Sequence, residues 1–233
     1  MTAERAKRTL AVVAARGGSK GIPLKNLLDL CGKPLIAWTV MQAAAARGVD
    51  VVAVSSDSDQ ILAAAEGAGA VGVRRPEAIS GDLDSSESAW LHALETIDGK
   101  LGPFERIVAL QATSPIREAS DIEKALDAFE REKLDSLLSV CEVEDYFNWR
   151  IGANGPEPIN YDFHNRRMRQ QIEKRYLENG SFYVLIPSLL REKHNRLGGK
   201  IGFHLMERHK MFQIDRIEDV KLCAAIMKSY GYA

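Results

Sequence analysis

A glycine-rich segment that carries several cations follows a short apolar run at residues 10–15. The segment spans residues 15–26 and reads Ala-Arg-Gly-Gly-Ser-Lys-Gly-Ile-Pro-Leu-Lys-Asn. Glycines let backbone N–H groups converge on an anion, and Arg16, Lys20 and Lys25 add positive charge around the same place. Because the apolar run is typical of a buried strand, the sequence predicts a polyphosphate-binding loop at the end of that strand.

Two better-known phosphate motifs do not fit this segment. The Walker motif needs Gly-x-x-x-x-Gly-Lys-[Ser/Thr], a spacing that the chain lacks. The dinucleotide fingerprint needs Gly-x-Gly-x-x-Gly after a strand; Gly18 and Gly21 supply its second half, but Arg16 stands where the first glycine should be. An ordinary glycine-rich turn with solvated charges is the alternative at this point.

Residues 15–26 resemble the nucleotidyltransferase loop of the cytidylyltransferases that activate nonulosonic, sialic-type acids. That loop follows the pattern Ala-Arg-Gly-Gly-Ser-Lys-x-Ile-Pro-x-Lys-Asn, and the chain matches it without a mismatch. The resemblance implies that Arg16 and Lys25 act in catalysis. It implies CTP binding by Ala15, Arg16, Gly17, Ser19, Lys20, Lys25 and Asn26.

A second segment, residues 75–82, resembles the family pattern Arg-Pro-x-x-Leu-Ala-x-Asp. The resemblance implies that Arg75 and Ser86 contact the cytosine, with Ser80 nearby. Hydroxyls at a helix N-terminus offer donors to a carbonyl such as cytosine O2. A turn followed by a capped helix is the alternative reading.

A third segment, residues 111–117, reads Gln-Ala-Thr-Ser-Pro-Ile-Arg and looks like the family's Gln-Pro-Thr-Ser-Pro-Leu-Arg, with Ala112 in place of the usual proline. Gln111, Thr113 and Ser114 are neutral hydrogen-bonding residues after a predicted strand, and they suit a hydroxylated sugar. A plain polar loop is the alternative.

The fourth segment, residues 169–183, is similar to Arg-Gln-x-x-Pro-x-x-Tyr-x-Glu-Asn-Gly-x-x-Tyr, with Glu173 in place of proline. The family's substrate is an α-keto acid sugar, and an arginine pairs with a carboxylate through two hydrogen bonds. The resemblance therefore implies sugar binding by Arg169 and Gln170. The arginines at 166–167 compete for the carboxylate, and a solvated basic surface is the alternative.

Residues 214–219 resemble the family's last strand-to-helix turn, Asp-Ile-Asp-x-x-x-Asp. The resemblance implies that Asp215 is a metal ligand and that Mg²⁺ is the cofactor. Gln213 stands where many members have the first aspartate. Mg²⁺ is commonly held by one or two carboxylates together with substrate phosphates and water. A helix cap is the alternative role for Asp215, and Asp219 is expected to serve the helix.

Composition narrows the class of protein. The chain has 233 residues with 45% apolar and 27% charged residues and a net charge of −1, which argues against a nucleic-acid partner. No apolar run approaches the roughly 18 residues needed to span a membrane. Three distant cysteines fit reduced thiols in the cytoplasm rather than a disulfide framework.

Strand and helix signals alternate over most of the chain, which predicts an α/β fold with a doubly wound, mostly parallel sheet, Rossmann-like in its nucleotide binding. Ligands then bind at the carboxyl ends of the strands. Ser120 and Glu123 predict a capping box. Strands are expected at residues 10–15, 51–55, 70–73, 106–110, 136–140, 181–186 and 210–214, and helices at 33–47, 57–66, 85–97, 120–133 and 217–230.

The alternation stops at residues 142–180, which are polar but still carry six aromatic residues. Because so many aromatics are unusual in a disordered loop, we expect a projecting arm inserted into a single cytidylyltransferase domain at residues 1–233. The resemblance implies that this arm forms a homodimer and contributes to sugar binding.

Four motifs in the family's order imply one activity: transfer of CMP from CTP to the anomeric hydroxyl of a nonulosonic acid, with release of pyrophosphate. Two alternatives remain. One is a cytidylyltransferase for 3-deoxy-octulosonate. The other is a catalytically silent nucleotide-binding module, an interpretation that Gln213 keeps open.

Overall fold

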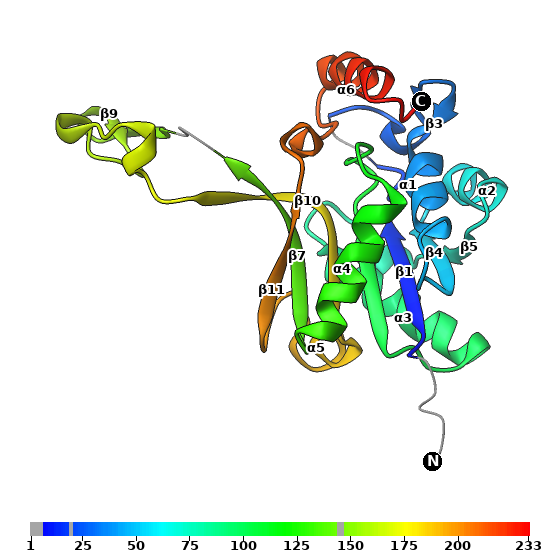
Figure 1. The fold of residues 1–233 in the computed structure, drawn as a ribbon. Helices are drawn as coiled ribbons and strands as arrows, with labels where there is room; N and C mark the ends of the chain where they lie inside the picture. The colour runs from blue at the N-terminus through cyan, green and yellow to red at the C-terminus, as the bar shows by residue number, and fades with distance from the viewer. Residues whose placement is uncertain (1–6, 19–20, 144–146) are drawn as a thin grey trace.

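A seven-stranded sheet forms the centre of the computed structural model, which describes residues 7–18, 21–143 and 147–233. Its strands lie in the order β11-β7-β10-β6-β1-β4-β5 (Figure 1). All neighbouring pairs are parallel except the two that β10 makes with β6 and β7. The strands are β1 (Thr9–Ala14), β4 (Val51–Ser56), β5 (Val71–Arg74), β6 (Arg106–Leu110), β7 (Ser136–Val143), β10 (Arg175–Leu185) and β11 (Ile201–Met206). The predicted mostly parallel α/β sheet is confirmed.

Helices cover both faces of the sheet, so the central strands are apolar on both sides. On β1, Ala11 and Val13 face one core and Leu10 and Val12 face the other. The first core includes α1 (Leu35–Ala44), α2 (Asp59–Gly67) and α4 (Ala119–Arg131), and the second includes α3 (Ser86–Leu101) and α5 (Pro187–Lys193). Among the described residues, no helix is both long and apolar enough to cross a bilayer.

The C-terminal helix α6 (Ile217–Ser229) packs against the segment that follows the phosphate loop. Cys223 and Met227 of α6 lie in one cluster with Ile22 and Trp38. Asp219 forms the capping box at the start of this helix, with Arg216 as the N-cap residue. Residues that follow the phosphate loop and the C-terminal helix therefore share one apolar cluster.

The predicted strand at 210–214 is wrong. The last strand is β11, and residues Arg208–Met211 form a 3-10 turn, η5. Lys210 is 1% exposed, and its ammonium group lies 2.7–2.9 Å from carboxylate oxygens of Glu118, Asp121 and Glu207. Burying a lysine requires such partners, and they hold the chain in a turn rather than in the sheet.

The carboxylates that hold Lys210 also decide where α4 begins. The predicted capping box of Ser120 and Glu123 is wrong, because Glu118 is the N-cap residue and Asp121 completes the box. Burial alone would raise the pKa of Asp121, but hydrogen bonds that include those from His204, the Glu118 N–H and Lys210 lower it to about 2. Asp121 thus serves both the helix cap and the buried lysine.

The segment between β7 and β10 extends away from the sheet as an arm (Figure 1). It contains the hairpin of β8 (Trp149–Gly152) and β9 (Gly155–Pro158), followed by the 3-10 turns η3 (Phe163–Asn165) and η4 (Arg169–Gln171). The ring of Trp149 packs against two other aromatic rings, with its centroid 5.9 Å from that of Tyr161 and 6.0 Å from that of Phe163. The predicted projection is observed, but residues from 175 onward belong to the sheet strand β10.

Candidate active site

A cleft of about 260 Å³ lies at the carboxyl ends of β1 and β6. It brings together residues from the first three sequence motifs, which lie up to about a hundred positions apart in the chain. The lining consists of Ala14, Arg16, Lys25, Asn26, Ser86, Trp90, Leu110, Gln111, Ala112 and Thr113. Six of these are predicted site residues, so the structure supports a common location for the predicted nucleotide and sugar motifs.

The phosphate loop is anchored to neighbouring strands through its backbone. The N–H of Ala15 donates to the carbonyl of Ser55 at 3.0 Å, and the N–H of Gly17 donates to Asp57 Oδ1 at 2.7 Å. A Cβ at Gly17 would lie 3.1 Å from the Cβ of Ser58, so a glycine is favoured there. Asp57 was not predicted as a site residue; its position directly after a strand was the available signal.

The other polar groups of the loop are also held. Asn26 is buried, and its side-chain amide donates to the carbonyl of Arg16 at 3.1 Å, which fixes the loop backbone. The predicted CTP-binding residues Ser19 and Lys20 lie outside the described residues. The described part of the loop is thus held in place by hydrogen bonds within the protein.

Both described cations of the loop face oxygen atoms. The guanidinium of Arg16 donates to the Gly81 carbonyl at 2.9 Å and lies 3.1 Å from Asp82 Oδ1. The ammonium of Lys25 donates to the Ile214 carbonyl and to Asp215 Oδ1, each at 3.1 Å. Carbonyl and carboxylate oxygens of the protein therefore accept from both cations.

The predicted metal site has one carboxylate of the right type. Asp215 is exposed beside Lys25, whereas the Gln213 amide donates to the Asn179 carbonyl at 2.5 Å. The carboxylate of Asp219 accepts from the N–H groups of Arg216 and Asp215, which lower its pKa, so it is occupied as a cap. No group of three potential metal ligands occurs among the described residues. This donor set fits Mg²⁺ only when nucleotide phosphates supply the other ligands.

Gln213 nevertheless lies next to the cleft. A Cβ on Gly180 would come within 2.7 Å of Gln213 Nε2 and 3.1 Å of Gln111 Oε1, so both amides border the same glycine. Gly180 has a φ of +64°, a backbone conformation that other residues adopt with strain. Position 213 is therefore close to the predicted sugar residue Gln111.

The predicted cytosine residues separate into two groups. Ser86 lines the cleft at the start of α3, where the neighbouring Ser85 caps the helix by accepting from the Ser88 N–H at 3.2 Å. Arg75 is buried, and its guanidinium donates to the Ser55 hydroxyl at 3.1 Å and carbonyl at 2.6 Å. Burial lowers the pKa of Arg75. Among described residues, Arg75 contacts the end of β4 rather than the cleft.

Two further serines have structural partners. The predicted base-binding Ser80 donates to the Pro76 carbonyl at 2.8 Å and is not in the cleft lining. The predicted sugar-binding Ser114 is 1% exposed and lies 3.5 Å from the Gly180 carbonyl. By contrast, Gln111 and Thr113 line the cleft. The third motif therefore offers two side chains to a ligand and uses the third to support the loop.

Arg117, the last residue of the third motif, has no predicted role but holds the motif against β10. It is fully buried, and its guanidinium donates to the Ser181 carbonyl at 2.7 Å and to the Thr39 hydroxyl at 3.1 Å. Burial lowers its pKa to about 10. Burying a guanidinium beside neutral acceptors costs free energy, and here Arg117 ties the third motif to β10.

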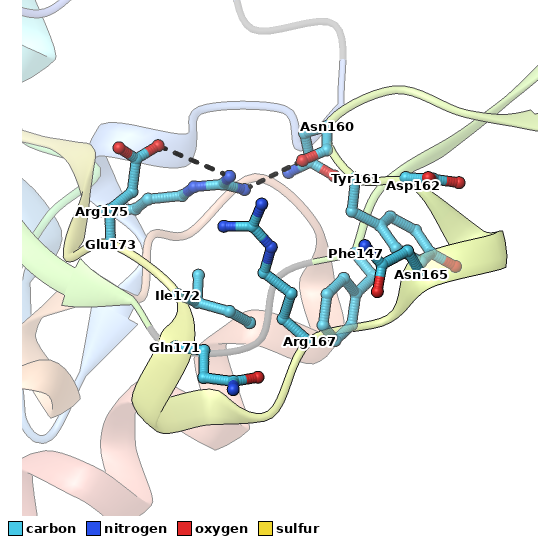
Figure 2. A pocket seen from close by; sticks show the side chains of 10 residues that line it. All are labelled: Phe147, Asn160, Tyr161, Asp162, Asn165, Arg167, Gln171, Ile172, Glu173 and Arg175. Atoms are coloured by element: carbon cyan, nitrogen blue, oxygen red, sulfur yellow. Dashed lines mark hydrogen bonds and ion pairs between the residues drawn. The ribbon is translucent and has the colours of Figure 1, made fainter.

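The predicted sugar-binding residues of the fourth motif do not line this cleft. Arg169 and Gln170 belong to η4 in the arm, away from the end of β1 (Figure 1). The arm has its own cavity of about 400 Å³. Figure 2 shows the Arg167 side chain pointing toward Arg175, whose guanidinium donates to the Asn160 carbonyl at 3.2 Å. One chain alone therefore does not bring the predicted carboxylate-binding residues to the sugar motif.

A family model described as "Cytidylyltransferase" matches residues 10–217. The chain belongs to the cytidylyltransferase family. The match covers all four motifs and most of the sheet, and it ends at the first residue of α6.

Two curated cytidylyltransferases illustrate the similarity. The N-acylneuraminate cytidylyltransferase of Oncorhynchus mykiss is 33% identical over 229 residues, covering 95% of this chain and 51% of that protein. This chain therefore spans about half the length of that relative. The pseudaminic acid cytidylyltransferase of Campylobacter jejuni strain 81-176 is 26% identical over 224 residues, covering 95% of this chain and 97% of that protein.

A solved structure shows that the fold is shared. A CMP:2-keto-3-deoxy-manno-octonic acid synthetase complexed with CTP aligns with a TM-score of 0.71 at 18% identity, covering 96% of this chain and 99% of that one. The chain thus has the α/β nucleotidyltransferase fold of cytidylyltransferases.

Proposed function

We propose that the protein transfers CMP from CTP to the anomeric hydroxyl of a nonulosonic acid and releases pyrophosphate. The observation that carries this proposal is the single cleft that joins the cationic phosphate loop, through Arg16 and Lys25, to the polar side chains of Gln111 and Thr113. Relatives named for N-acylneuraminate and pseudaminic acid cytidylyl transfer support the same class of acceptor.

Positioning and charge stabilisation would supply the catalysis. The anomeric hydroxyl attacks the α-phosphorus in line with the departing pyrophosphate, a reaction that needs no covalent intermediate with the protein. Arg16 and Lys25, together with Lys20, offset the charge that develops on the phosphates. Ser86, which lines the cleft at the start of α3, would present its hydroxyl to the base.

A magnesium ion fits this scheme when it arrives with the nucleotide. Asp215 would hold it as the main protein ligand, since its carboxylate is exposed beside the cation Lys25. The ion would supply charge neutralisation on the triphosphate. Gln213 would contribute no negative charge, so the protein alone would bind the ion weakly.

Completion of the sugar site would need a second chain. In one chain the arm carries Arg169 and Gln170 away from the cleft, which supports a homodimer in which each arm serves the partner's cleft. Exposed apolar residues on the arm, Trp149, Ile151 and Phe163, also favour burial against another chain. The free state of all three cysteines agrees with a cytoplasmic enzyme.

A panel of acceptors tests the proposal. Pyrophosphate release and CMP-sugar formation would be measured with CTP, Mg²⁺ and, separately, N-acetylneuraminate, legionaminate, pseudaminate and 3-deoxy-octulosonate. We expect turnover with one of the three nonulosonates. Turnover with 3-deoxy-octulosonate alone would favour the alternative acceptor, and no turnover with any acid would favour a silent nucleotide-binding module.

A further inference from the structure

The guanidinium of Arg16 is bound by a surface turn rather than by the sheet. Two of its partners, the Gly81 carbonyl at 2.9 Å and Asp82 Oδ1 at 3.1 Å, belong to the same turn at residues 81–84. The side chains of Arg16 and Asp82 are 30% and 43% exposed. The pair therefore lies at the border of the cleft and can be reached by a ligand.

The turn at residues 81–84 is closed by its own hydrogen bonds. Asp84 Oδ2 accepts from the Gly81 N–H at 2.7 Å, and the Asp84 N–H donates to the Gly81 carbonyl at 3.3 Å. Leu83 at its tip is fully exposed. Asp84 therefore fixes the shape of the turn independently of the contact with Arg16.

A carboxylate and a phosphate compete for the same guanidinium donors. Arg binds either group in a similar forked geometry, and Arg16, whose guanidinium lies 3.1 Å from Asp82 Oδ1, lines the cleft. A triphosphate that takes Arg16 would bring several negative charges close to Asp82, which like-charge repulsion disfavours.

We infer that Asp82 and the triphosphate of CTP exchange places on Arg16, so that the turn at residues 81–84 leaves the phosphate loop when nucleotide binds. This inference rests on the proposed function and adds a residue that sets nucleotide affinity. Before the nucleotide binds, Asp82 keeps Arg16 oriented, and the same contact then opposes the nucleotide.

Asp82→Asn is the first test, with CTP binding measured by calorimetry in Mg²⁺ and without any sugar acid. Asparagine retains the size and loses the charge, so we expect CTP to bind about two- to fivefold more tightly at low salt, the range set by one exposed ion pair. The gain should shrink at high salt. Asp127→Asn is the matched control. Asp127 lies on α4, where its carboxylate is 3.8 Å from the guanidinium of Arg47, and its substitution should leave CTP binding unchanged.

A label on the turn is the second test. Leu83→Cys in a Cys31→Ser background places one accessible thiol on the turn, because Cys141 and Cys223 are buried. We expect the anisotropy of a fluorophore there to fall as CTP saturates the protein, and to be low before CTP is added when Asp82→Asn is also present.

The outcomes separate this inference from the proposed function. Unchanged or weaker CTP binding by Asp82→Asn would overturn the exchange, and a label that does not respond to CTP would overturn the release of the turn. A wild-type protein that does not bind CTP at all would overturn the proposed function and the inference together.

Discussion

The phosphate loop and the arm are both polar, arginine-containing segments, but they are stabilised in opposite ways. The loop is tied to residues far away in the chain: Gly17 to Asp57, and Lys25 to Asp215. The arm is stabilised mainly by local contacts, such as the ion pair of Arg150 and Glu157 at 2.6 Å. The rest of the fold therefore fixes the loop, whereas the arm keeps its shape through its own residues.

The largest expected effect lies in the loop. Lys25→Ala should lower kcat by about 100-fold or more, the scale for a lost electrostatic stabiliser, because Lys25 would no longer offset charge on the leaving phosphates. Steady-state kinetics with CTP and the accepted sugar would measure it. Lys124→Ala, an exposed lysine on α4, is the matched control. Near-normal turnover of a folded Lys25→Ala variant would contradict the role given to Lys25.

The metal ligand should come next. Asp215→Asn should lower kcat by about tenfold or more and raise the Mg²⁺ concentration needed for half-maximal rate, because one of few charged ligands is lost. Gln213→Asp should have the opposite effect on Mg²⁺ binding to the CTP complex, measured by calorimetry. An Asp215→Asn enzyme with unchanged Mg²⁺ dependence would remove Asp215 from the metal site.

A substitution in the arm should change the KM for the sugar acid and leave the KM for CTP unchanged. Arg169→Lys keeps the charge and loses the fork, so KM for the sugar acid should rise by about tenfold, the worth of one charge-assisted hydrogen bond, while KM for CTP stays near wild type. Arg150→Lys, elsewhere on the arm, controls for nonspecific effects. A rise in KM for CTP instead would assign Arg169 to the nucleotide.

The last prediction concerns the mass of the protein in solution, which should differ from the chain mass by a factor of two. If the arm serves a partner's cleft, light scattering at micromolar concentration should give about twice the chain mass of 25.8 kDa. Mixing Lys25→Ala with Arg169→Ala should then restore activity to part of the mixed dimers, because one cleft would have an intact loop and an intact arm. A monomer mass would exclude the shared site.

Local patterns in the sequence predicted most of the sheet. The apolar run of β6 at residues 106–110 was predicted with its observed bounds. The edge strand β11 was missed because its large apolar residues, Ile201, Phe203 and Leu205, are exposed, while its other face carries Gly202 and His204. The helix α5 was missed as well, since it has only seven residues.

The candidate site was predictable where a motif contains it, as for Arg16, Lys25 and Gln111 in the cleft. What the motifs could not indicate were the partners. Gly17 and Asp57 are 40 positions apart, and Arg16 and Gly81 are 65 apart. Such pairs depend on strand order, which no local pattern contains.

The ion pair between Lys25 and Asp215 has a consequence for the synthesis of the chain. The two residues are 190 positions apart, so at about 5 to 20 residues per second a ribosome makes Asp215 roughly 10 to 40 s after Lys25. During this interval Ile22 and Trp38 lack the surface of α6 that later covers them. A nascent chain therefore exposes an unfinished nucleotide loop throughout this interval, and the ability to bind CTP should emerge only when α6 has left the exit tunnel.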